Sequence, residues 1–338
     1  MAGRHAVTNA APTKTNRRAL RFTLRGLLLL TMLVCLALGW CVNRVHRQRA
    51  AVAWVRQHPE SIIDYSDPTA PAWLVDWMGI DFFATVKRVS MTTPQSDPSP
   101  LAALPGLKNL DFSSSRVTNL SPLAALTRLE GVSLRTPRAR DLMFLKGMNS
   151  LTSLELIDTQ PSDADRLGGL PHLTYLRIWG KQVQDLNGLA ECIGLQGLVI
   201  RDTSVQDVLP LAGLGNIEEF VLGRSPVRDI SPLSGLTRLK VLVLSDLPIS
   251  DVSALTSMRS LERLVLTGTL VTDLSPIASL GKLRTLNLHD VPNSSLQPLT
   301  KLTGLQYLYV RDLDPASEKQ LQAAMPQCKV RSRTNAGP

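Results

Sequence analysis

Aspartate returns every 22 residues over much of this chain, so the side chains with the most obvious potential for chemistry form a column. Its seven members are Asp141, Asp163, Asp185, Asp207, Asp229, Asp251 and Asp273. A column of carboxylates suggests a cation site, but a bound cation needs several oxygens that converge on one point. Asp273 is followed by Ser275 and Pro276, and these three residue types start turns and short helical segments. We therefore expect the aspartates to cap turns, with no bound metal.

The other reactive side chains do not have the spacing that catalysis requires. The five histidines show no metal-binding spacing, and the chain has no glycine-rich phosphate loop, nucleophile elbow or convergent carboxylate pair. The four cysteines have neither disulfide nor zinc spacing, and Cys192 stands where other repeats place leucine, as a small core residue. The sequence predicts a protein that is not an enzyme and has no cofactor.

The aspartate column belongs to a repeat that spans most of the chain. Ten successive units of 22 residues open, usually as L-x-x-L-x-L, at Leu107, Leu129, Leu151, Leu173, Leu195, Ile217, Leu239, Leu261, Leu283 and Leu305. One such unit cannot bury its own apolar face, so it must stack on its neighbours as a solenoid. Stacked strands present a long surface without an obvious catalytic pocket, and binding is therefore the expected function.

Alternation along each strand divides its side chains between the core and the surface. In one unit Leu264 and Leu266 point inward, whereas Arg263, Val265 and Thr267 lie on the exposed concave face. The central exposed position reads along the array as Asp111, Ser133, Glu155, Arg177, Val199, Val221, Val243, Val265, Asn287 and Tyr309. Its four consecutive valines cover about 15 Å, because neighbouring strands lie roughly 4.8 Å apart.

Aromatic and arginine residues flank this valine row on the same face. Valine suits any exposed strand, so the row by itself has little meaning. An apolar patch bordered by aromatic and arginine side chains, however, is typical of a protein-binding hot spot. The candidate ligand-binding surface consists of Tyr175, Arg177, Trp179, Val199, Arg201, Val221, Val243, Val265, His289, Tyr307, Tyr309 and Arg311.

The repeat pattern L-x-x-L-x-L-x-x-T-x-V-x-D-L-S-P-L resembles leucine-rich repeats and is similar to their internalin-type subclass over residues 86–330. The resemblance implies an α/β leucine-rich-repeat solenoid with a parallel concave sheet. It also implies an internal hydrogen-bond ladder, which the family builds from asparagine. That position here holds Ser115, Pro137, Thr159, Lys181, Thr203, Ser225, Leu247, Thr269, Val291 and Leu313. Only its Ser and Thr members can therefore contribute to a ladder.

A hydrophobic segment near the N-terminus predicts a transmembrane helix before the solenoid. Gly26–Val42 is an uncharged run of 17 residues, at the short end of the length that spans a bilayer. A cleaved signal peptide is the alternative, but no A-x-A site follows the run. Six basic residues precede the run and three follow it closely, which favours a cytoplasmic N-terminus and extracytoplasmic repeats. The segments RALRFTLRGLLLLTMLVCLALGW, RQRAAVAWV and PAWLVDWMGIDFFATVKRVSM also resemble bacterial membrane-anchored leucine-rich repeat proteins.

The net charge of +9 comes from the N-terminal segment and not from the repeats. Residues 1–56 hold ten Lys and Arg and no acid, whereas residues 57–338 hold 27 basic and 28 acidic side chains, a net charge of −1. Nucleic-acid binding needs basic charge clustered on a folded face. The sequence therefore predicts no nucleic-acid partner.

The ends of the stack need caps, because a terminal repeat must hide the open core. The aromatic cluster of Trp73, Trp77, Phe82 and Phe83 is the expected N-terminal cap, and the helix-like stretch ASEKQLQAAM begins the C-terminal one. The predicted parts are a cytoplasmic basic tail (1–25), a transmembrane anchor (26–43), a juxtamembrane helix and N-terminal cap (44–85), leucine-rich repeats (86–314), and a C-terminal cap and tail (315–338).

Taken together, the sequence predicts a membrane-anchored leucine-rich repeat module that binds a protein or envelope ligand through its concave face. Two alternatives remain open: a cytoplasmic-facing scaffold or regulator, and a structural envelope protein without a specific ligand. Protease accessibility of the repeats in intact cells separates the two orientations. A pull-down with residues 58–338 tests whether any specific ligand exists.

Overall fold

A computed structural model describes residues 24–333, apart from residues 96, 160–166, 168, 293–294, 312 and 314. Asp163 of the aspartate column and the N-terminal basic tail as far as residue 23 lie outside the described residues. The chain forms two compact units, residues 1–45 and residues 46–338. The repeats and both of their caps belong to the second unit.

The apolar segment forms the N-terminal part of a long helix, α1 (Leu24–Arg56). Most of its large apolar side chains between Leu27 and Val42 are exposed, with none packed in a core. Among the described residues, it is the one helix long and apolar enough to cross a membrane. A signal sequence near an N-terminus has the same length and composition, so the helix alone does not distinguish the two.

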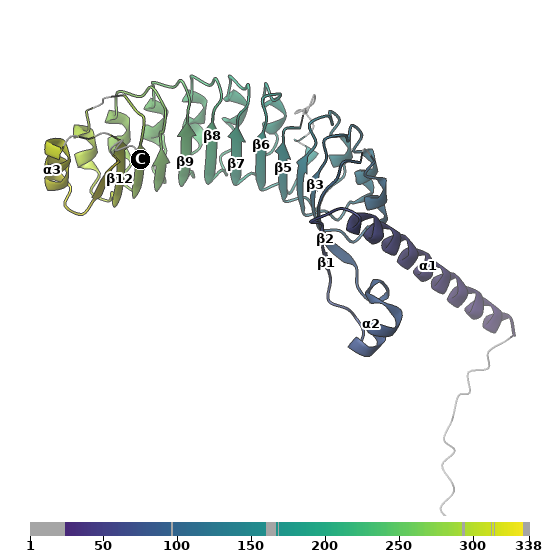
Figure 1. Ribbon diagram of the computed structural model, residues 1–338. Coiled ribbons are helices and arrows are strands. Elements are labelled where there is room, and N and C mark those ends of the chain that lie inside the picture. Colours follow the sequence, from purple (N-terminus) through teal and green to yellow (C-terminus); the bar gives the residue numbers. More distant parts are fainter. Residues whose placement is uncertain are drawn as a thin grey trace, which may run out of the picture. The chain divides into compact units, whose positions relative to one another are not determined.

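In the described part of the second unit, thirteen strands form one sheet whose spatial order is the sequence order (Figure 1). β1 (Ile62–Tyr65) pairs with its neighbour in the antiparallel direction, and all later pairs are parallel. The remaining strands are β2 (Val86–Thr92), β3 (Asn109–Ser113), β4 (Gly131–Arg135), β5 (Ser153–Ile157), β6 (Tyr175–Trp179), β7 (Gly197–Arg201), β8 (Glu219–Gly223), β9 (Val241–Ser245), β10 (Arg263–Val265), β11 (Thr285–Leu288), β12 (Tyr307–Arg311) and β13 (Lys329–Arg333). The predicted solenoid with its parallel sheet is confirmed, and β1 adds an antiparallel strand before the repeats.

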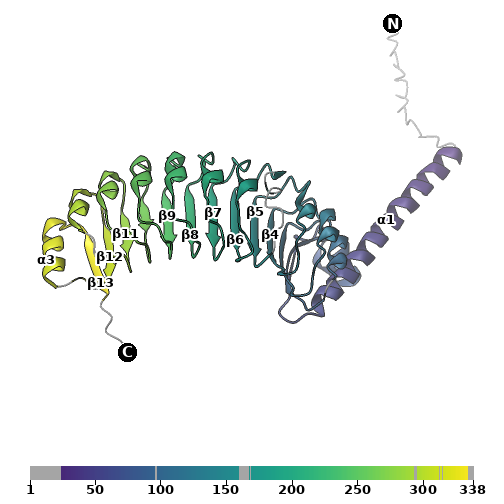
Figure 2. The same cartoon turned by 90° about the horizontal axis from the view of Figure 1, so that it is seen from above.

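Short 3-10 helices lie on the outer side of the arc, and the strands lie on its inner side (Figure 2). They are η2 (Ser99–Ala103), η3 (Ser121–Ala125), η4 (Met143–Leu145), η6 (Asn187–Leu189), η7 (Leu209–Leu211), η8 (Ser231–Gly235), η9 (Ser253–Ser257), η10 (Ser275–Ser279) and η11 (Gln297–Lys301). The sheet therefore occupies the concave face, as the repeat pattern predicts.

The aspartate column starts these helices. Asp229 Oδ1 accepts a hydrogen bond of 2.8 Å from the backbone N–H of Ser231, and Asp273 does the same for Ser275. The backbone and side-chain hydrogen bonds from Ser231 lower the pKa of Asp229 below its usual value. Each carboxylate satisfies backbone donors that a helix start leaves without intrahelical partners. The turn role predicted for the column is confirmed for these members, whereas the N-cap positions are Ile230 and Leu274, which make no side-chain cap hydrogen bond.

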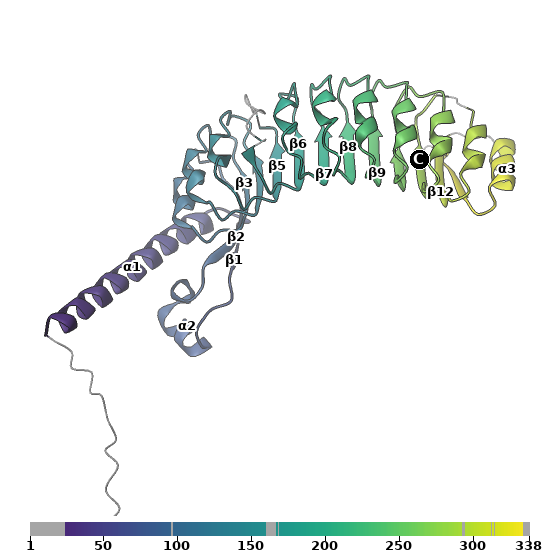
Figure 3. The ribbon, with the colours of Figure 1, turned by 180° about the vertical axis from the view of Figure 1, so that it is seen from behind.

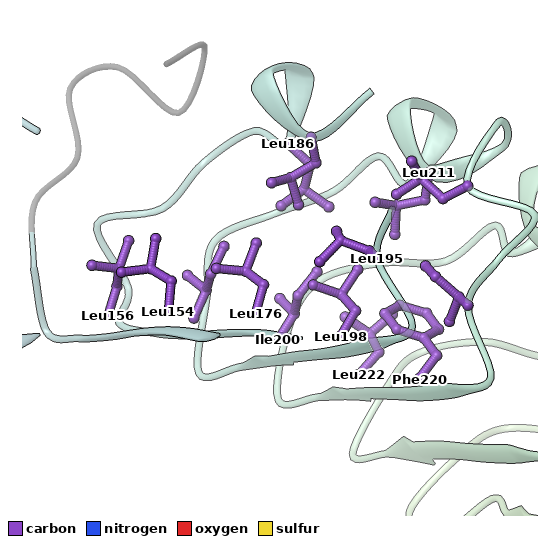
Figure 4. Packing of buried hydrophobic residues seen from close by; sticks show 14 of the residues in the cluster. Leu154, Leu156, Leu176, Leu186, Leu195, Leu198, Ile200, Leu211, Phe220 and Leu222 are labelled. Carbon is purple, nitrogen blue, oxygen red and sulfur yellow. The ribbon is translucent and has the colours of Figure 1, made fainter. Parts of the chain in front are cut away.

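The nine leucines and one isoleucine that open the repeats form the centre of the core. All ten, from Leu107 to Leu305, are at most 1% exposed. Figure 4 shows inward side chains of adjacent strands in contact, with Leu198 and Ile200 of β7 beside Phe220 and Leu222 of β8. Cys192 is 3% exposed within the same core, and burial raises the pKa of its thiol to about 11. The prediction that Cys192 is a core residue is therefore confirmed.

A column of residues with positive φ follows the strands and decides which hydroxyl points inward. It consists of Asp158, Gly180, Asp202, Arg224, Asp246, Gly268 and Asp290. Aspartate and glycine are the residue types that adopt this conformation most readily. In these units the next residue turns into the core where it is Thr or Ser, as Thr203 and Ser225 do.

The first two units have no positive-φ residue at this place, and the position of the buried hydroxyl differs there. Ser114 and Thr136 are buried, one residue before the predicted Ser115 and Pro137. The predicted ladder position is therefore wrong in these two units. Without the left-handed residue, the chain reaches the interior one residue earlier.

The buried hydroxyls differ in their hydrogen bonding, which gives a paired prediction. Thr203 Oγ1 has no hydrogen-bond partner among the described residues, whereas Thr269 Oγ1 donates to the Leu266 carbonyl at 3.0 Å. We expect Thr203→Val to raise the free energy of unfolding by about 1 kcal/mol. Valine has the shape of threonine but lacks the buried hydroxyl, which has no partner among the described residues. Thr269→Val should lower it by about 1 kcal/mol. Denaturant unfolding of the two variants measures both effects, and equal shifts would contradict this account.

The N-terminal end of the stack is closed by the last turns of α1 and not by the aromatic cluster as a whole. Ala51, Val52 and Val55 belong to the core that β2 continues. Trp73 and Trp77 lie on a separate short helix, α2 (Ala72–Met78), and are 69% and 78% exposed. The predicted capping role is wrong for these two tryptophans, because the end of α1 already supplies the apolar side chains that cover the core.

The C-terminal end carries the predicted helix, α3 (Pro315–Ala324), followed by β13. Leu321, Met325 and Cys328 are buried against the last repeat. β13 pairs with β12 at the same 22-residue offset that relates the repeats, with Tyr307 beside Lys329. The cap therefore extends the inner face by one more strand.

Candidate binding surface on the inner face of the sheet

The register of the strands places all of the predicted surface residues on one face. Arg177, Val199 and Val221 are direct neighbours on β6, β7 and β8, and the row continues through Val243, Val265, Asn287 and Tyr309. Two residues away on the same face lie Tyr175 and Tyr307 on one side of the row. Trp179, Arg201, His289 and Arg311 lie on the other side.

Only two of the four valines in the row are partly exposed, and the other two are buried. Val199 and Val221 are 6% and 7% exposed, whereas Val243 and Val265 are partly exposed. The prediction that all four valines lie open to solvent is therefore wrong for two of them. Next to Val199, on the Tyr175 side of the row, the Tyr175 ring lies so close over Gly197 that a methyl group there would meet it at 2.5 Å.

The first of two aromatic clusters, termed here the Arg177 cluster, consists of Glu155, Tyr175, Arg177 and Trp179 on β5 and β6. The Arg177 guanidinium lies between two rings, 5.7 Å from the centroid of Tyr175 and 5.5 Å from that of Trp179. It donates at 3.0 Å to Glu155 Oε1 and at 3.0 Å to Tyr175 Oη. Rings and a carboxylate together hold this side chain in one orientation.

Two donors of the Arg177 cluster are left without acceptors. Arg177 Nε and Trp179 Nε1 are both buried atoms that have no hydrogen-bond partner among the described residues. Burial lowers the pKa of Arg177, but the hydrogen bonds to Glu155 and Tyr175 outweigh burial and raise it overall. The guanidinium therefore stays charged, while the two N–H groups that have no partner among the described residues lie beneath the surface of the cluster.

The second cluster, termed here the Tyr309 cluster, consists of His289, Tyr307, Tyr309, Arg311 and Lys329 at the C-terminal end. The rings of Tyr307 and Tyr309 stack with centroids 6.5 Å apart, and His289 meets Tyr309 edge-on at 6.3 Å. Lys329 Nζ lies 5.8 Å from the centroid of Tyr307, and Arg311 forms an ion pair with Asp290. This surface combines aromatic rings with positive charge, as the first cluster does.

The face between the two clusters is different on the two sides of the row. On the Trp179 side, after Arg201, the strands carry the small side chains of Gly223, Ser245 and Thr267, whereas on the Tyr175 side Glu219 and Arg263 are exposed. From β6 to β12 there are six strand spacings, which correspond to about 29 Å. The two clusters therefore form separate contact points on one face, and one extended ligand can reach both.

Three residues of this surface were not among those predicted. Glu155 orients Arg177, Lys329 packs over Tyr307, and Arg331 pairs with Tyr309 across β12 and β13. The 22-residue count predicts the last two, because 329 and 331 lie 22 positions after 307 and 309. The partnership of Glu155 with Arg177 has the same spacing, but only the side-chain geometry reveals it.

The described part of the face offers recognition by stacking, charge and hydrogen bonding. Among the described residues, no group of three or more His, Cys, Asp and Glu side chains has the geometry to hold a metal ion. The aspartates of the outer turns are occupied with backbone N–H groups.

Solved structures share this fold. An internalin (inlF) from Listeria monocytogenes has a TM-score of 0.56 at 19% identity, over 78% of this chain and 88% of that one. The plant peptide hormone receptor RGFR1, solved in complex with RGF2, gives 0.52 at 14% identity, over 74% and 47% of the two chains. TLR13, solved in complex with ssRNA13, gives 0.54 at 21% identity, over 62% and 32%. No family profile matches the sequence, and no curated protein matches it.

These likenesses establish the fold class. The chain is an internalin-like leucine-rich-repeat protein in its fold, with a long solenoid sheet preceded by an apolar helix. The identities are low, so what the other proteins bind is a property of those proteins.

Proposed function

We propose that this chain is a membrane-anchored, non-enzymatic binding module whose inner face captures a protein ligand at the Arg177 and Tyr309 clusters. The observation that carries the proposal is the Arg177 cluster itself. A guanidinium held between two rings and oriented by a carboxylate has the composition of a binding hot spot. The fold supports a binding role, since solved proteins that share it include complexes with a peptide hormone and with an RNA.

The chemistry of the two clusters favours an extended polypeptide with acidic or carbonyl acceptors. Rings accept apolar side chains, while Arg201 and Lys329 add positive charge at opposite ends of the face. An extended strand rises about 3.3 Å per residue, so roughly nine residues span the ~29 Å between β6 and β12. Such a segment can contact both clusters and lie over the partly exposed Val243 and Val265.

The membrane part of the proposal relies on α1 and its flanking charges. Six basic residues precede Gly26 and three follow Val42 closely, which supports a cytoplasmic N-terminus and extracytoplasmic repeats. The alternatives are a cytoplasmic-facing scaffold and a structural envelope protein without a specific ligand. Protease digestion of the repeats in intact cells distinguishes the orientations.

Photo-crosslinking in the native membrane tests the binding role. A photoreactive phenylalanine analogue replaces Trp179 or Tyr309 in the full chain, and the matched control places it at Ile193, which is 67% exposed outside the inner face. We expect one protein to be crosslinked from both inner-face positions and not from Ile193. Identical products from all three positions, or none from either inner-face position, would contradict the proposed surface. A nucleic acid as the common product would contradict the protein ligand while retaining the surface.

A further inference from the structure

The short helix α2 carries the two most exposed large apolar side chains among the described residues. Trp77 is 78% exposed and Trp73 is 69% exposed, more than the side chains of the apolar segment of α1. None of the residues of α2 is buried. The two tryptophans are four positions apart, so they lie on the same side of the helix. Figures 1 and 3 show α2 in the connection between β1 and β2, which projects away from the stacked repeats.

Polar contacts hold the segment that contains α2, whose Leu74, Val75 and Met78 are only partly buried. Arg49 Nη2 donates to the Met78 carbonyl at 2.6 Å, and its guanidinium pairs with Asp81 at 3.6 Å. Gln48 donates to Asp81 Oδ1 at 2.9 Å and to the Ala84 carbonyl at 3.0 Å. Tyr65 donates to the same carboxylate at 3.2 Å, and its own burial, followed by Asp81, raises its pKa to about 12. We term Gln48, Arg49 and Asp81 the polar latch. It fixes the segment to the part of α1 that belongs to the second unit.

The latch ties α2 to residues of α1 that follow the apolar run along the same helix. Arg49 follows Val42 by seven residues of the same helix, a length of about 10 Å. The polar region of a bilayer extends roughly 5–8 Å beyond each side of its hydrocarbon core. Tryptophan is enriched in this region, because its ring is apolar and its N–H is polar. Packing inside the protein does not explain the exposure of Trp73 and Trp77, whereas a lipid surface does.

We propose that the Trp73–Trp77 face of α2 inserts into the headgroup region of the bilayer that holds α1, as a second membrane contact. This inference rests on the proposed membrane anchoring. The contact fixes the height of the first repeat above the lipid, since the Gln48–Arg49–Asp81 latch connects α2 to the helix that caps the stack. It holds on whichever side of the membrane the repeats lie.

Fluorescence quenching by brominated lipids tests the contact. Five full-length variants each retain one of Trp40, Trp54, Trp73, Trp77 and Trp179, with the others replaced by phenylalanine, in vesicles of zwitterionic and anionic phospholipid. We expect bromine near the headgroup end of the acyl chains to quench Trp73 and Trp77 and their emission to be blue-shifted. Trp54, which packs against the core and donates to Gln95, is the matched control and should keep its fluorescence.

The other tryptophans separate the possible failures. Quenching of Trp40 without quenching of Trp73 and Trp77 would overturn the second contact and leave the anchor intact. A blue shift of Trp73 and Trp77 without quenching would assign the face to a second copy of this chain and equally overturn the proposal. If Trp40 also escapes quenching, the anchoring premise is wrong and the inference fails with it. Because the side chains of α2 are not buried, Trp73→Ser with Trp77→Ser should leave protease resistance of the repeats unchanged.

Discussion

Phe220→Ala should lower the free energy of unfolding by about 3–5 kcal/mol, the largest stability effect expected from a single substitution in this chain. Phe220 is fully buried on β8, and its inward neighbours on β7 and β9 are Leu198 and Leu242. Truncation leaves a cavity between three coils that cannot collapse without shifting the register of the sheet. Denaturant unfolding followed by circular dichroism measures the loss.

The same variant should weaken the coupling between the two halves of the array. Each coil of a solenoid contacts only its neighbours, so a damaged interface in the middle allows the ends to unfold separately. Hydrogen exchange should therefore show faster exchange in β7–β9 than in β11–β12. Phe220→Leu is the matched control and should cost less than about 1.5 kcal/mol, since it keeps most of the volume. A loss from Phe220→Ala no greater than this would contradict the account of the core.

Trp179→Ala should weaken binding of the protein crosslinked from position 309 by about 30-fold, which corresponds to ~2 kcal/mol. The substitution removes one of the two rings that hold the Arg177 guanidinium, together with the unpaired indole N–H. Tyr309→Ala should have an effect of similar size, because it removes the central ring of the second cluster. Quantitative capture of that protein by the purified variants measures both losses.

The double variant Trp179→Ala with Tyr309→Ala tests whether one ligand contacts both clusters. The two clusters are about 29 Å apart, and effects of distant sites add. The losses in free energy should therefore sum if one ligand contacts both clusters. Ile193→Ala is the control and should bind as the unchanged chain does. Val221 is a poor probe of the surface despite its central position, because it is 7% exposed. Full binding by Trp179→Ala would exclude the Arg177 cluster from the interface.

Much of the fold follows from sequence because the repeat fixes it at every coil. A leucine every 22 residues determines which side chains face inward, and stacking of equivalent coils then fixes the register of neighbouring strands. This reasoning places Arg177 beside Val199 on the neighbouring strand, as the structure has them. It also places Tyr307 and Tyr309, two residues apart on one strand, on the same face. It also predicts the turn role of Asp229, since the residues after it are turn formers.

The ends of the array were less predictable than its middle. The aromatic residues before β2 have the composition of a cap, yet Trp73 and Trp77 are exposed and Ala51, Val52 and Val55 close the core. A cap has no repeat to define its register, so composition alone does not tell which apolar residues face the core. The choice depends on how α1 docks against β2, which is a tertiary property.

The sequence by itself determined the solenoid, the face of each strand and the order of side chains along the sheet, because these depend on a covalent spacing repeated in every coil. Only the tertiary structure decided which of these side chains is exposed, paired or covered. Val199 is buried, Arg177 is held between Tyr175 and Trp179, and Ser114 takes the inward place of Ser115. Exposure and pairing depend on side chains from coils 22 residues away on either side, and on a single backbone angle after each strand.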